Sequence, residues 1–412
     1  MMQRPVRSVL LIVSGSIAAF KVPDLVRLLL ADGVQVRCVL THAGAQFVTP
    51  LTLQALTGKP VYTELFSLTD EQEMGHIALS RSADLIVVCP ASANLLAKMA
   101  QGLADDLAST ILLATDAPVM VAPAMNVRMW EHPATRANIE QLQKRGVLLI
   151  PPTSGIMACG EFGPGRMAKP VDVKDCIIAY FRRSLQQGGG ALSGTRALVT
   201  AGPTHEPMDP VRYIANRSSG QQGYAIANAL ADLGAEVTLI SGPTTLRKPA
   251  GVAVQNCETA LEMQALVAAL PVQDVAVCTA AVADWRPAQI VDQKIKKQSR
   301  DDVPAPLELV PNPDLLADIS APSPSRPQLV IGFAAETENV EAHARAKRLR
   351  KGCDWIVAND VGKNSDVMGG SENQITLITE QGSEQWPRLD KNDVAQRLAA
   401  LISERLSGKI DL

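Results

Sequence analysis

Hydroxyl side chains gather after the first two apolar segments of the chain. Ser14 and Ser16 lie at the end of the segment VLLIVSG and just beyond it, and Thr41 ends the next apolar segment. Hydroxyls and the free amides at a helix N-terminus can together hold a single phosphate group. The pattern therefore suits a mononucleotide such as flavin mononucleotide, while a capped helix without a ligand explains it equally well.

Two pairs of lysines have the spacing needed to act on one anion. Lys294 and Lys296, in the sequence KIKK, would project to the same side of an extended segment. Lys347 and Lys351 are four residues apart and would share one face of a helix. Two cations on one side of a segment can attract an anion together. A solvated basic loop and a helix end whose cations compensate the dipole are the alternatives.

A short polar segment precedes another predicted helix. Asn216 stands before Ser218, Ser219 and Gly220, and Arg212 lies four residues earlier. The helix that follows would direct its free amides toward a bound phosphate. The segment is therefore a second candidate phosphate site.

The usual dinucleotide signatures are missing from both halves of the chain. There is no Walker A sequence, and the first loops read SGSIAAF and AGPTHEP instead of G-x-G-x-x-G. The second strands end in Thr41-His42 and Ser241-Gly242, where an acid would usually bind the ribose hydroxyls. The sequence therefore disfavours NAD in both halves.

The two halves repeat one plan, in which apolar β-branched strands alternate with helical segments. This pattern predicts two doubly wound parallel sheets with helices on both faces, an α/β fold of the Rossmann-like kind. The glycine-rich segment 184–194 predicts a flexible linker, with domains at 1–190 and 191–412. The predicted strands lie within 9–15, 31–42, 83–94, 118–126 and 146–152, and within 196–203, 235–243, 273–285, 327–339 and 354–361.

Composition excludes several classes of protein. The chain has 412 residues, 47% hydrophobic and 3% aromatic, with a net charge of -3, so no basic field exists to hold a nucleic acid. No apolar run approaches the roughly 20 residues of a membrane span, and Gly15 interrupts the segment that imitates a secretory signal. Seven scattered cysteines without a C-x-x-C pair indicate a cytoplasmic protein.

Three loop sequences carry a specific resemblance, namely PASAN at 90–94, PAMNVRMW at 123–130 and ACGEFGPGRM at 158–167. With them, residues 1–183 resemble the homo-oligomeric flavin-containing cysteine decarboxylases, whose fold is flavodoxin-like. Residues 191–408 resemble the phosphopantothenate-cysteine ligases. The resemblance implies a coenzyme A biosynthesis enzyme that joins cysteine to 4'-phosphopantothenate with CTP, and then decarboxylates the product with FMN.

The first resemblance assigns roles in decarboxylation. His76 matches the family's base, Asn126 the amide that binds the substrate carboxylate, and Cys159 the proton donor on a mobile flap. It also implies trimers, in which two residues of a neighbouring subunit contact the flavin. The implied flavin ligands are Ser14, Ser16, Thr41, Ser92 and Asn94, with Ser109 and Thr110 from the neighbouring subunit.

The second resemblance assigns roles in ligation. Lys294 matches the family's essential lysine, and Asn216 the asparagine that turns over an acyl-cytidylate. Dimer contacts and Mg²⁺ are implied as well, although no carboxylate cluster suggests the metal ligands. Pro311 and the 367–373 loop depart from the family pattern. The implied substrate-binding residues are Arg212, Cys278, Thr279, Ala280, Asp284, Lys294, Pro313, Asp314, Leu315, Leu316, Phe333, Lys347 and Lys351.

Two other functions compete with this interpretation. The duplicated sheets alone would permit a flavin-dependent oxidoreductase with a nucleotide-binding partner domain, but the missing acids after the second strands argue against it. A regulatory flavoprotein is the second alternative. The presence of His76, Asn126 and Cys159 together argues against that function.

Overall fold

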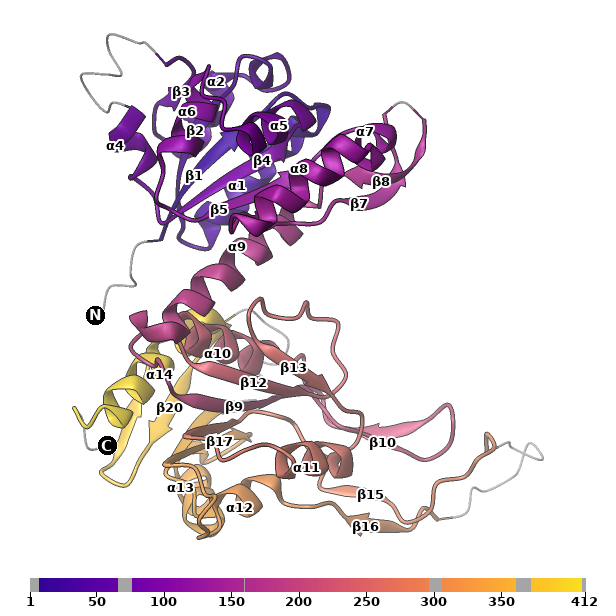
Figure 1. Cartoon of the computed structure of the whole chain (residues 1–412). Helices are drawn as coiled ribbons and strands as arrows, with labels where there is room; N and C mark the ends of the chain where they lie inside the picture. Colours follow the sequence, from indigo (N-terminus) through magenta and orange to yellow (C-terminus); the bar gives the residue numbers. More distant parts are fainter. Residues whose placement is uncertain (1–6, 66–75, 159, 296–305, 361–371, 410–412) are drawn as a thin grey trace. The chain divides into compact units, whose positions relative to one another are not determined.

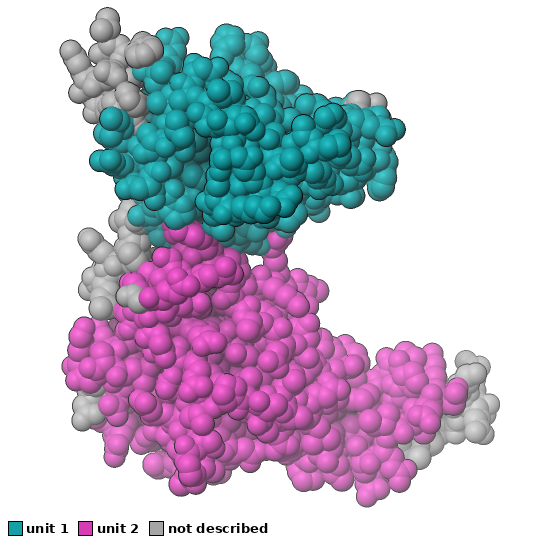
Figure 2. All heavy atoms as spheres, viewed as in Figure 1, with its two compact units in different colours: residues 1–178 teal, residues 179–412 magenta. Residues whose placement is uncertain are grey.

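The chain forms two compact units in the computed structural model, residues 1–178 and 179–412, as Figure 2 shows. The structure describes residues 7–65, 76–158, 160–295, 306–360 and 372–409, with the side chains of His76 and Asp360 left out. Within these ranges, no helix has the length and apolar character to cross a membrane.

The first unit is a parallel sheet of six strands in the order β3-β2-β1-β4-β5-β6 (Figure 1). Without the two-residue β3, the remaining order is that of the flavodoxin-like doubly wound sheet. The predicted fold class is therefore confirmed. The strands are β1 (Ser8–Val13), β2 (Gln35–Leu40), β3 (Val61–Tyr62), β4 (Leu85–Ala91), β5 (Val119–Pro123) and β6 (Leu148–Leu149).

Helices cover the strands of the first unit because both faces of its central strands are apolar. Leu10 and Ile12 of β1 pack in one core with Leu96 and Ile111, and the alternate residue Leu11 is also fully buried. The helices are η1 (Ile17–Lys21), α1 (Val22–Ala31), η2 (Gly44–Gln46), α2 (Pro50–Thr57), α4 (His76–Ser80), α5 (Ala93–Gln101), α6 (Leu107–Ala114), α7 (Val127–Glu131), α8 (Pro133–Lys144) and α9 (Pro170–Ser184).

The second unit has an eight-stranded sheet in the order β13-β12-β9-β14-β17-β18-β20-β21. The first six strands are parallel; five of them were predicted from the sequence, and β13 was not. Strands β20 and β21 add an antiparallel edge that the sequence does not predict. The strands are β9 (Arg196–Ala201), β12 (Glu236–Ser241), β13 (Ala253–Asn256), β14 (Val275–Cys278), β17 (Leu329–Glu336), β18 (Trp355–Asp360), β20 (Ile375–Ile378) and β21 (Ser383–Gln385).

Two layers of helices enclose this second sheet (Figure 1). Residues of α10 and α14 share one core with Val277 and Ile331, whereas α13 packs with the alternate strand residues Val330 and Ile356. Successive residues of a strand face opposite sides of the sheet, so α10 and α14 cover one face and α12 and α13 cover the other. The helices are α10 (Gln221–Asp232), α11 (Ala260–Ala268), α12 (Leu315–Ser320), α13 (Val340–Lys351) and α14 (Lys391–Leu406).

Four short antiparallel pairs, which the sequence pattern does not predict, extend from the two sheets. In the first unit, β7 (Thr153–Ile156) pairs with β8 (Phe162–Arg166). In the second unit, the pairs are β10 (His205–Pro207) with β11 (Tyr213–Ala215), β15 (Trp285–Pro287) with β16 (Leu309–Pro311), and β19 (Glu372–Asn373) with β22 (Leu389–Asp390).

The glycine run predicted to be a flexible linker is instead ordered. Helix α9 continues into the π-helical turn η3 (Leu185–Gly189). The Gln186 side chain donates to the Ala235 carbonyl at 3.1 Å, and the Leu192 amide donates to the Leu233 carbonyl at 2.8 Å. A Cβ at Gly190 would lie 2.3 Å from the Leu233 carbonyl oxygen, so the glycine permits a close backbone approach. The domain limits at residue 190 remain a prediction, since the compact units divide inside α9.

A buried ion pair fastens the end of α9 within the second unit. Arg182, 4% exposed, donates to Asp232 at 3.1 Å, to the Asn228 side chain at 2.9 Å and to the Ala250 carbonyl. Removing the guanidinium would leave a buried carboxylate without this cation.

We expect Arg182→Met to lower the free energy of unfolding of the second unit by about 3 kcal/mol. Urea denaturation followed by circular dichroism measures this loss. Arg183→Met is the matched control, because its side chain is exposed and next in sequence. Equal urea midpoints for the two variants would contradict the assigned role of the ion pair.

Candidate active site

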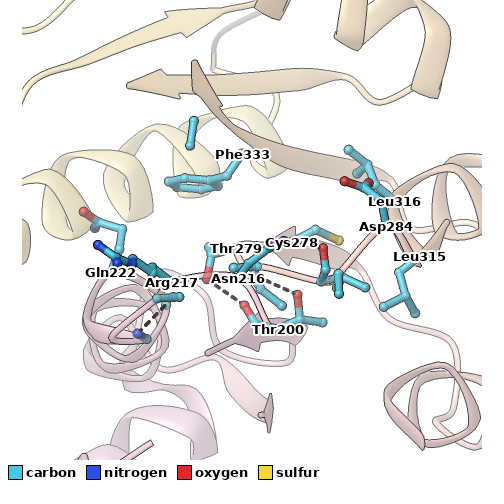
Figure 3. A pocket seen from close by; sticks show the side chains of 18 of the residues that line it. Thr200, Asn216, Arg217, Gln222, Cys278, Thr279, Asp284, Leu315, Leu316 and Phe333 are labelled. Carbon is cyan, nitrogen blue, oxygen red and sulfur yellow. Dashed lines mark hydrogen bonds between the residues drawn. The ribbon is translucent and has the colours of Figure 1, made fainter. Parts of the chain in front are cut away.

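A cavity of about 840 Å³ opens in the second unit, lined by residues of β9, β14 and β17, by the loops that follow β11, β14 and β16, and by the first residues of α10 (Figure 3). Parallel strands end at one edge of a sheet, which is why segments far apart in sequence meet here. The predicted residues that line it are Asn216, Cys278, Thr279, Ala280, Asp284, Pro313, Asp314, Leu315, Leu316, Phe333, Lys347 and Lys351.

The floor of the cavity is held by the adjacent ends of β9 and β14. The Thr279 hydroxyl donates to the Thr200 carbonyl at 2.6 Å, and the Ala280 amide donates to the Thr200 hydroxyl at 3.3 Å. Gly223 of α10 packs on this floor, because a Cβ there would lie 2.4 Å from the Thr279 hydroxyl and 2.5 Å from the Ala201 Cβ. Only glycine therefore lets α10 begin this close to the sheet.

Asn216 lies on the loop that leads into α10. Its side-chain amide donates to the Val282 carbonyl at 2.9 Å, which ties this loop to the one after β14. The helix cap, Gly220, has a left-handed conformation with φ of 74° and provides no side-chain cap. Amides at the start of α10 therefore face the same cavity as Asn216.

The opposite wall of the cavity carries two lysines of α13. Lys351 forms an ion pair with Asp314, which also caps α12 by accepting from the Ala317 amide at 3.2 Å. Burial alone would raise the pKa of Asp314, but the hydrogen bonds from Lys351 and Ala317 lower it. Lys347 donates to the Phe333 carbonyl at 2.9 Å, and burial lowers the pKa of its ammonium group.

Arg212 and Lys294 do not line the cavity. Arg212 donates to Asp209 at 2.6 Å and to the Ile295 carbonyl at 3.1 Å, and the Ile295 amide donates to Asp209 at 3.2 Å. The hydrogen bond from Arg212 is the main reason that the pKa of Asp209 is low. This ion pair therefore fixes the backbone beside Lys294, while Lys296 lies outside the described residues.

Polar residues of the lining that were not predicted from the sequence include Gln222, Asn312, Asn359, Asn373 and Lys391. Asn312 stands next to the predicted segment Pro313–Leu316, and its side chain donates to the Ala283 carbonyl at 2.8 Å. The other four belong to helix starts or strands with no recognisable motif, so only the fold brings them together.

The predicted flavin ligands of the first unit lie after β1, β2 and β4, which are neighbours in the sheet. The Ser14 hydroxyl donates to the Pro90 carbonyl at 2.7 Å and accepts from the Ser92 amide at 2.8 Å. Ser16 caps η1, Ser92 caps α5 beside the exposed Asn94, and Thr41 accepts from the Gly44 amide at 3.0 Å.

The packing of these loops agrees with a site for a small phosphate-bearing group. A Cβ at Gly15 would lie 2.5 Å from the Ala43 Cβ, and one at Gly44 would lie 2.5 Å from the Val13 carbonyl oxygen. The glycines therefore let the loops after β1 and β2 pack against each other beside two helix starts. A cradle of hydroxyls and helix-start amides fits the phosphate of a flavin mononucleotide.

Ser109 and Thr110 are less available than the other predicted flavin ligands. Ser109 is 2% exposed, and its hydroxyl donates to Asp106 at 2.8 Å in a capping box at the start of α6. Thr110 donates to the Ala104 carbonyl at 3.5 Å. Both therefore already have partners within one chain.

Asn126, one of the predicted catalytic residues of the first unit, contacts the loop of the β7–β8 hairpin. Asn126 caps α7, accepting from the Arg128 amide at 2.7 Å, and its side-chain amide donates to the carboxylate of Glu161. The Met125 amide donates to the Gly165 carbonyl at 3.0 Å, which fastens the hairpin to the same loop. Cys159 lies outside the described residues, and His76 is described only as the first residue of α4.

Metal ligation finds no support in the described part of the chain. No group of three or more histidine, cysteine, aspartate or glutamate side chains gathers there in a way that could hold a metal ion.

Comparisons with known proteins cover both units. Residues 2–182 match the family described as Flavoprotein, and residues 192–406 match the family described as DNA/pantothenate metabolism flavoprotein C-terminal domain. The chain is 45% identical over 404 residues to the coenzyme A biosynthesis bifunctional protein CoaBC of Escherichia coli strain K12, covering 98% of each. It is 43% identical over 401 residues to the protein of that name from Vibrio cholerae serotype O1, covering 97% of this chain and 98% of the relative.

One solved structure is similar to part of this chain. The crystal structure of the C-terminal domain of a coenzyme A biosynthesis bifunctional protein CoaBC has 39% sequence identity and a TM-score of 0.44. It covers 53% of this chain and 99% of that chain.

The lowered pKa of Lys347 predicts a pH dependence for anion binding. Only the protonated ammonium attracts an anion, so affinity for inorganic tripolyphosphate should fall as the pH rises through a pKa below the ordinary 10.5. Lys347→Arg keeps its charge and should extend binding to higher pH. Calorimetric titrations between about pH 7 and 10 measure both curves. An identical alkaline decline in the two proteins would exclude Lys347 as its cause.

Proposed function

This chain belongs to the family of coenzyme A biosynthesis bifunctional proteins, and we propose how its two units perform the two reactions. It is an enzyme with a flavoprotein decarboxylase unit and a phosphopantothenate-cysteine ligase unit. The family assigns these activities. The residues, cosubstrates and assembly that follow are proposals.

The second unit joins the carboxylate of 4'-phosphopantothenate to the amine of cysteine. A carboxylate must first be activated, and we propose that its oxygen attacks the α-phosphorus of CTP, with loss of pyrophosphate. The cysteine nitrogen then attacks the acyl carbon of this acyl-cytidylate, and CMP leaves. The observation that carries this proposal is the single cavity shared by Asn216, Asp284, Phe333, Lys347 and Lys351.

Each wall of the cavity suits one part of this reaction. Lys347 and Lys351 offer cations to the nucleotide, and Phe333 offers an apolar ring. Lys294 belongs to a segment whose backbone is fixed by Asp209, and it would reach the phosphates from there. Mg²⁺ would enter with the triphosphate, with phosphate oxygens and water as its main ligands.

Asn216 is suited to act on the acyl-cytidylate. Its side-chain amide is a neutral donor on the loop that leads into α10, and the amides at the start of that helix also favour negative charge. The proposed role is to stabilise the oxygen that becomes negative when cysteine attacks.

The first unit removes carbon dioxide from 4'-phosphopantothenoylcysteine. FMN, when bound, supplies the transient oxidation of the thiol-bearing carbon that gives the departing carboxylate's electrons somewhere to go. His76 accepts the proton of the substrate thiol, and Cys159 supplies a proton to the product. Asn126 donates to the substrate carboxylate, which takes the place of the Glu161 carboxylate on its amide.

We propose a cytoplasmic homo-oligomer, with trimers formed by the first unit and dimers by the second. Exposed apolar side chains support self-association, including Phe20, Leu51 and Leu113 of the first unit and Trp285 and Ile290 of the second. The cysteines of the described residues are free, which supports a reducing compartment. Domain limits of 1–190 and 191–412 are retained as part of this proposal.

The experiment that tests the whole proposal is incubation with 4'-phosphopantothenate, cysteine and CTP. Both pyrophosphate and 4'-phosphopantetheine should form, and replacing CTP by NADPH should give neither. Oxidation of NADPH without CTP would instead favour a flavin-dependent oxidoreductase.

Asn216→Asp should let the acyl-cytidylate accumulate. The new carboxylate repels the negative charge that develops on the attacked group, so the second half-reaction should slow by about 100-fold or more. Quenched-flow mass spectrometry detects the adduct. Asn256→Asp is the control, since Asn256 is exposed at the end of β13 and does not line the cavity. Failure to detect any adduct would remove Asn216 from this step.

Cys159→Ser should separate carbon dioxide release from product formation. A serine hydroxyl is a far weaker acid than a thiol, so the oxidised, decarboxylated ene-thiol should accumulate in place of 4'-phosphopantetheine. Labelled carbon dioxide and the thiol product are measured together. Normal yields of both would exclude the thiol as proton donor.

A further inference from the structure

A buried lysine lies on the wall of the cavity, and the reaction proposed above assigns it no role. Lys391 is the first residue of α14, is 9% exposed and lines the cavity. Its ammonium donates to the Gln221 side-chain oxygen at 3.3 Å, and its carbonyl accepts from the Gln222 side chain at 3.1 Å. Lys391 is therefore held at the point where α10 and α14 both begin.

The surrounding polar side chains form a fixed cluster. Asn373, 3% exposed, donates to the Gln222 side-chain oxygen at 3.4 Å and also lines the cavity. Its own side-chain oxygen is buried and has no hydrogen-bond partner among the residues that the structure describes. A buried polar cluster with an unsatisfied member is costly unless it has a role in binding.

The charges of the described lining are distributed unevenly. Its two carboxylates are Asp284 and Asp314, and the latter is paired with Lys351. Figure 3 shows Asp284 and Gln222 at opposite ends of the cavity, and Lys391 contacts Gln222. The end that holds Lys391 therefore combines an ammonium group with the N-terminus of α10, whose cap residue Gly220 has no side chain, and both attract an anion.

We propose that Lys391 is a substrate-binding residue of the ligase, whose ammonium donates to a phosphoryl oxygen at the α10 end of the cavity. This inference rests on the proposed function. Two substrate groups have the required chemistry, the triphosphate of CTP and the phosphate monoester of 4'-phosphopantothenate. The cations of α13 lie on the opposite wall, so Lys391 allows an extended anion to be held from both layers of helices.

The test compares Lys391→Met, which removes the charge, with Lys391→Arg, which keeps it. Calorimetry on the full chain measures the dissociation constants for CTP and for 4'-phosphopantothenate separately. A charge-assisted hydrogen bond is lost in the Met variant, so one of the two constants should rise about tenfold or more. The Arg variant should retain most of the affinity. The ligand that is affected identifies which phosphoryl group is bound.

Arg397→Met is the matched control on the same helix. Arg397 pairs with Glu384 and lies over the Trp386 ring, and it does not line the cavity. This variant loses a cation from α14 and should bind both ligands as the unaltered chain does. Thermal melting of all variants shows whether the second unit remains folded.

Two results would overturn the proposal. One is a folded Lys391→Met variant that binds both ligands with unchanged affinity. The other is an equal loss in the Met and Arg variants, which would mean that Lys391 only joins α14 to α10. If the unaltered chain binds neither CTP nor 4'-phosphopantothenate, the proposed ligase function fails as well. If the unaltered chain forms pyrophosphate and Lys391→Met binds both ligands normally, the ligase function stands and only the role of Lys391 is contradicted.

Discussion

Both units depend on one constraint, the burial of both faces of their central parallel strands. Val275, Val277 and Ile331 are fully buried in the second unit, as are Leu10 and Ile86 in the first. Such strands have no room for polar chemistry along their length. Polar side chains are therefore concentrated in the loops at the carboxyl edge, and the order of strands decides which loops meet. The cavity beyond β9, β14 and β17 follows directly from that order.

Close backbone approach is the second requirement, and glycine satisfies it at each edge. Gly223 lets α10 begin against Thr279, and Gly15 lets the loop after β1 pack on Ala43. Any side chain at Gly223 would push the helix start away from the cavity, and with it Gln222. The small residues of these loops therefore position the functional groups without contacting a substrate themselves.

The sequence predicted what is local in the chain and missed what only the fold assembles. The parallel strands and segments such as Cys278–Ala280 and Pro313–Leu316 were recognisable because their residues are contiguous. Asn373 and Lys391 belong to no recognisable sequence motif. They became candidates only through their contacts with Gln222, which precedes them in the chain by 151 and 169 residues. The glycine run near residue 190 was wrongly expected to be flexible, because its backbone contacts with Leu233 are also non-local. The roles of individual site residues stay predictions.

The two proposed reactions need opposite electrostatic environments at a carboxyl group, and the two sites differ in charge accordingly. Activation of a carboxylate with a triphosphate benefits from positive charge, and the ligase cavity is lined by Arg217, Lys347, Lys351 and Lys391. Loss of carbon dioxide is hindered by a cation that stabilises the starting carboxylate, and there the proposed contact is the neutral amide of Asn126. That amide already holds the carboxylate of Glu161. Exchange of one carboxylate for another conserves the hydrogen bond, so the Glu161 side chain can give up this donor to the substrate.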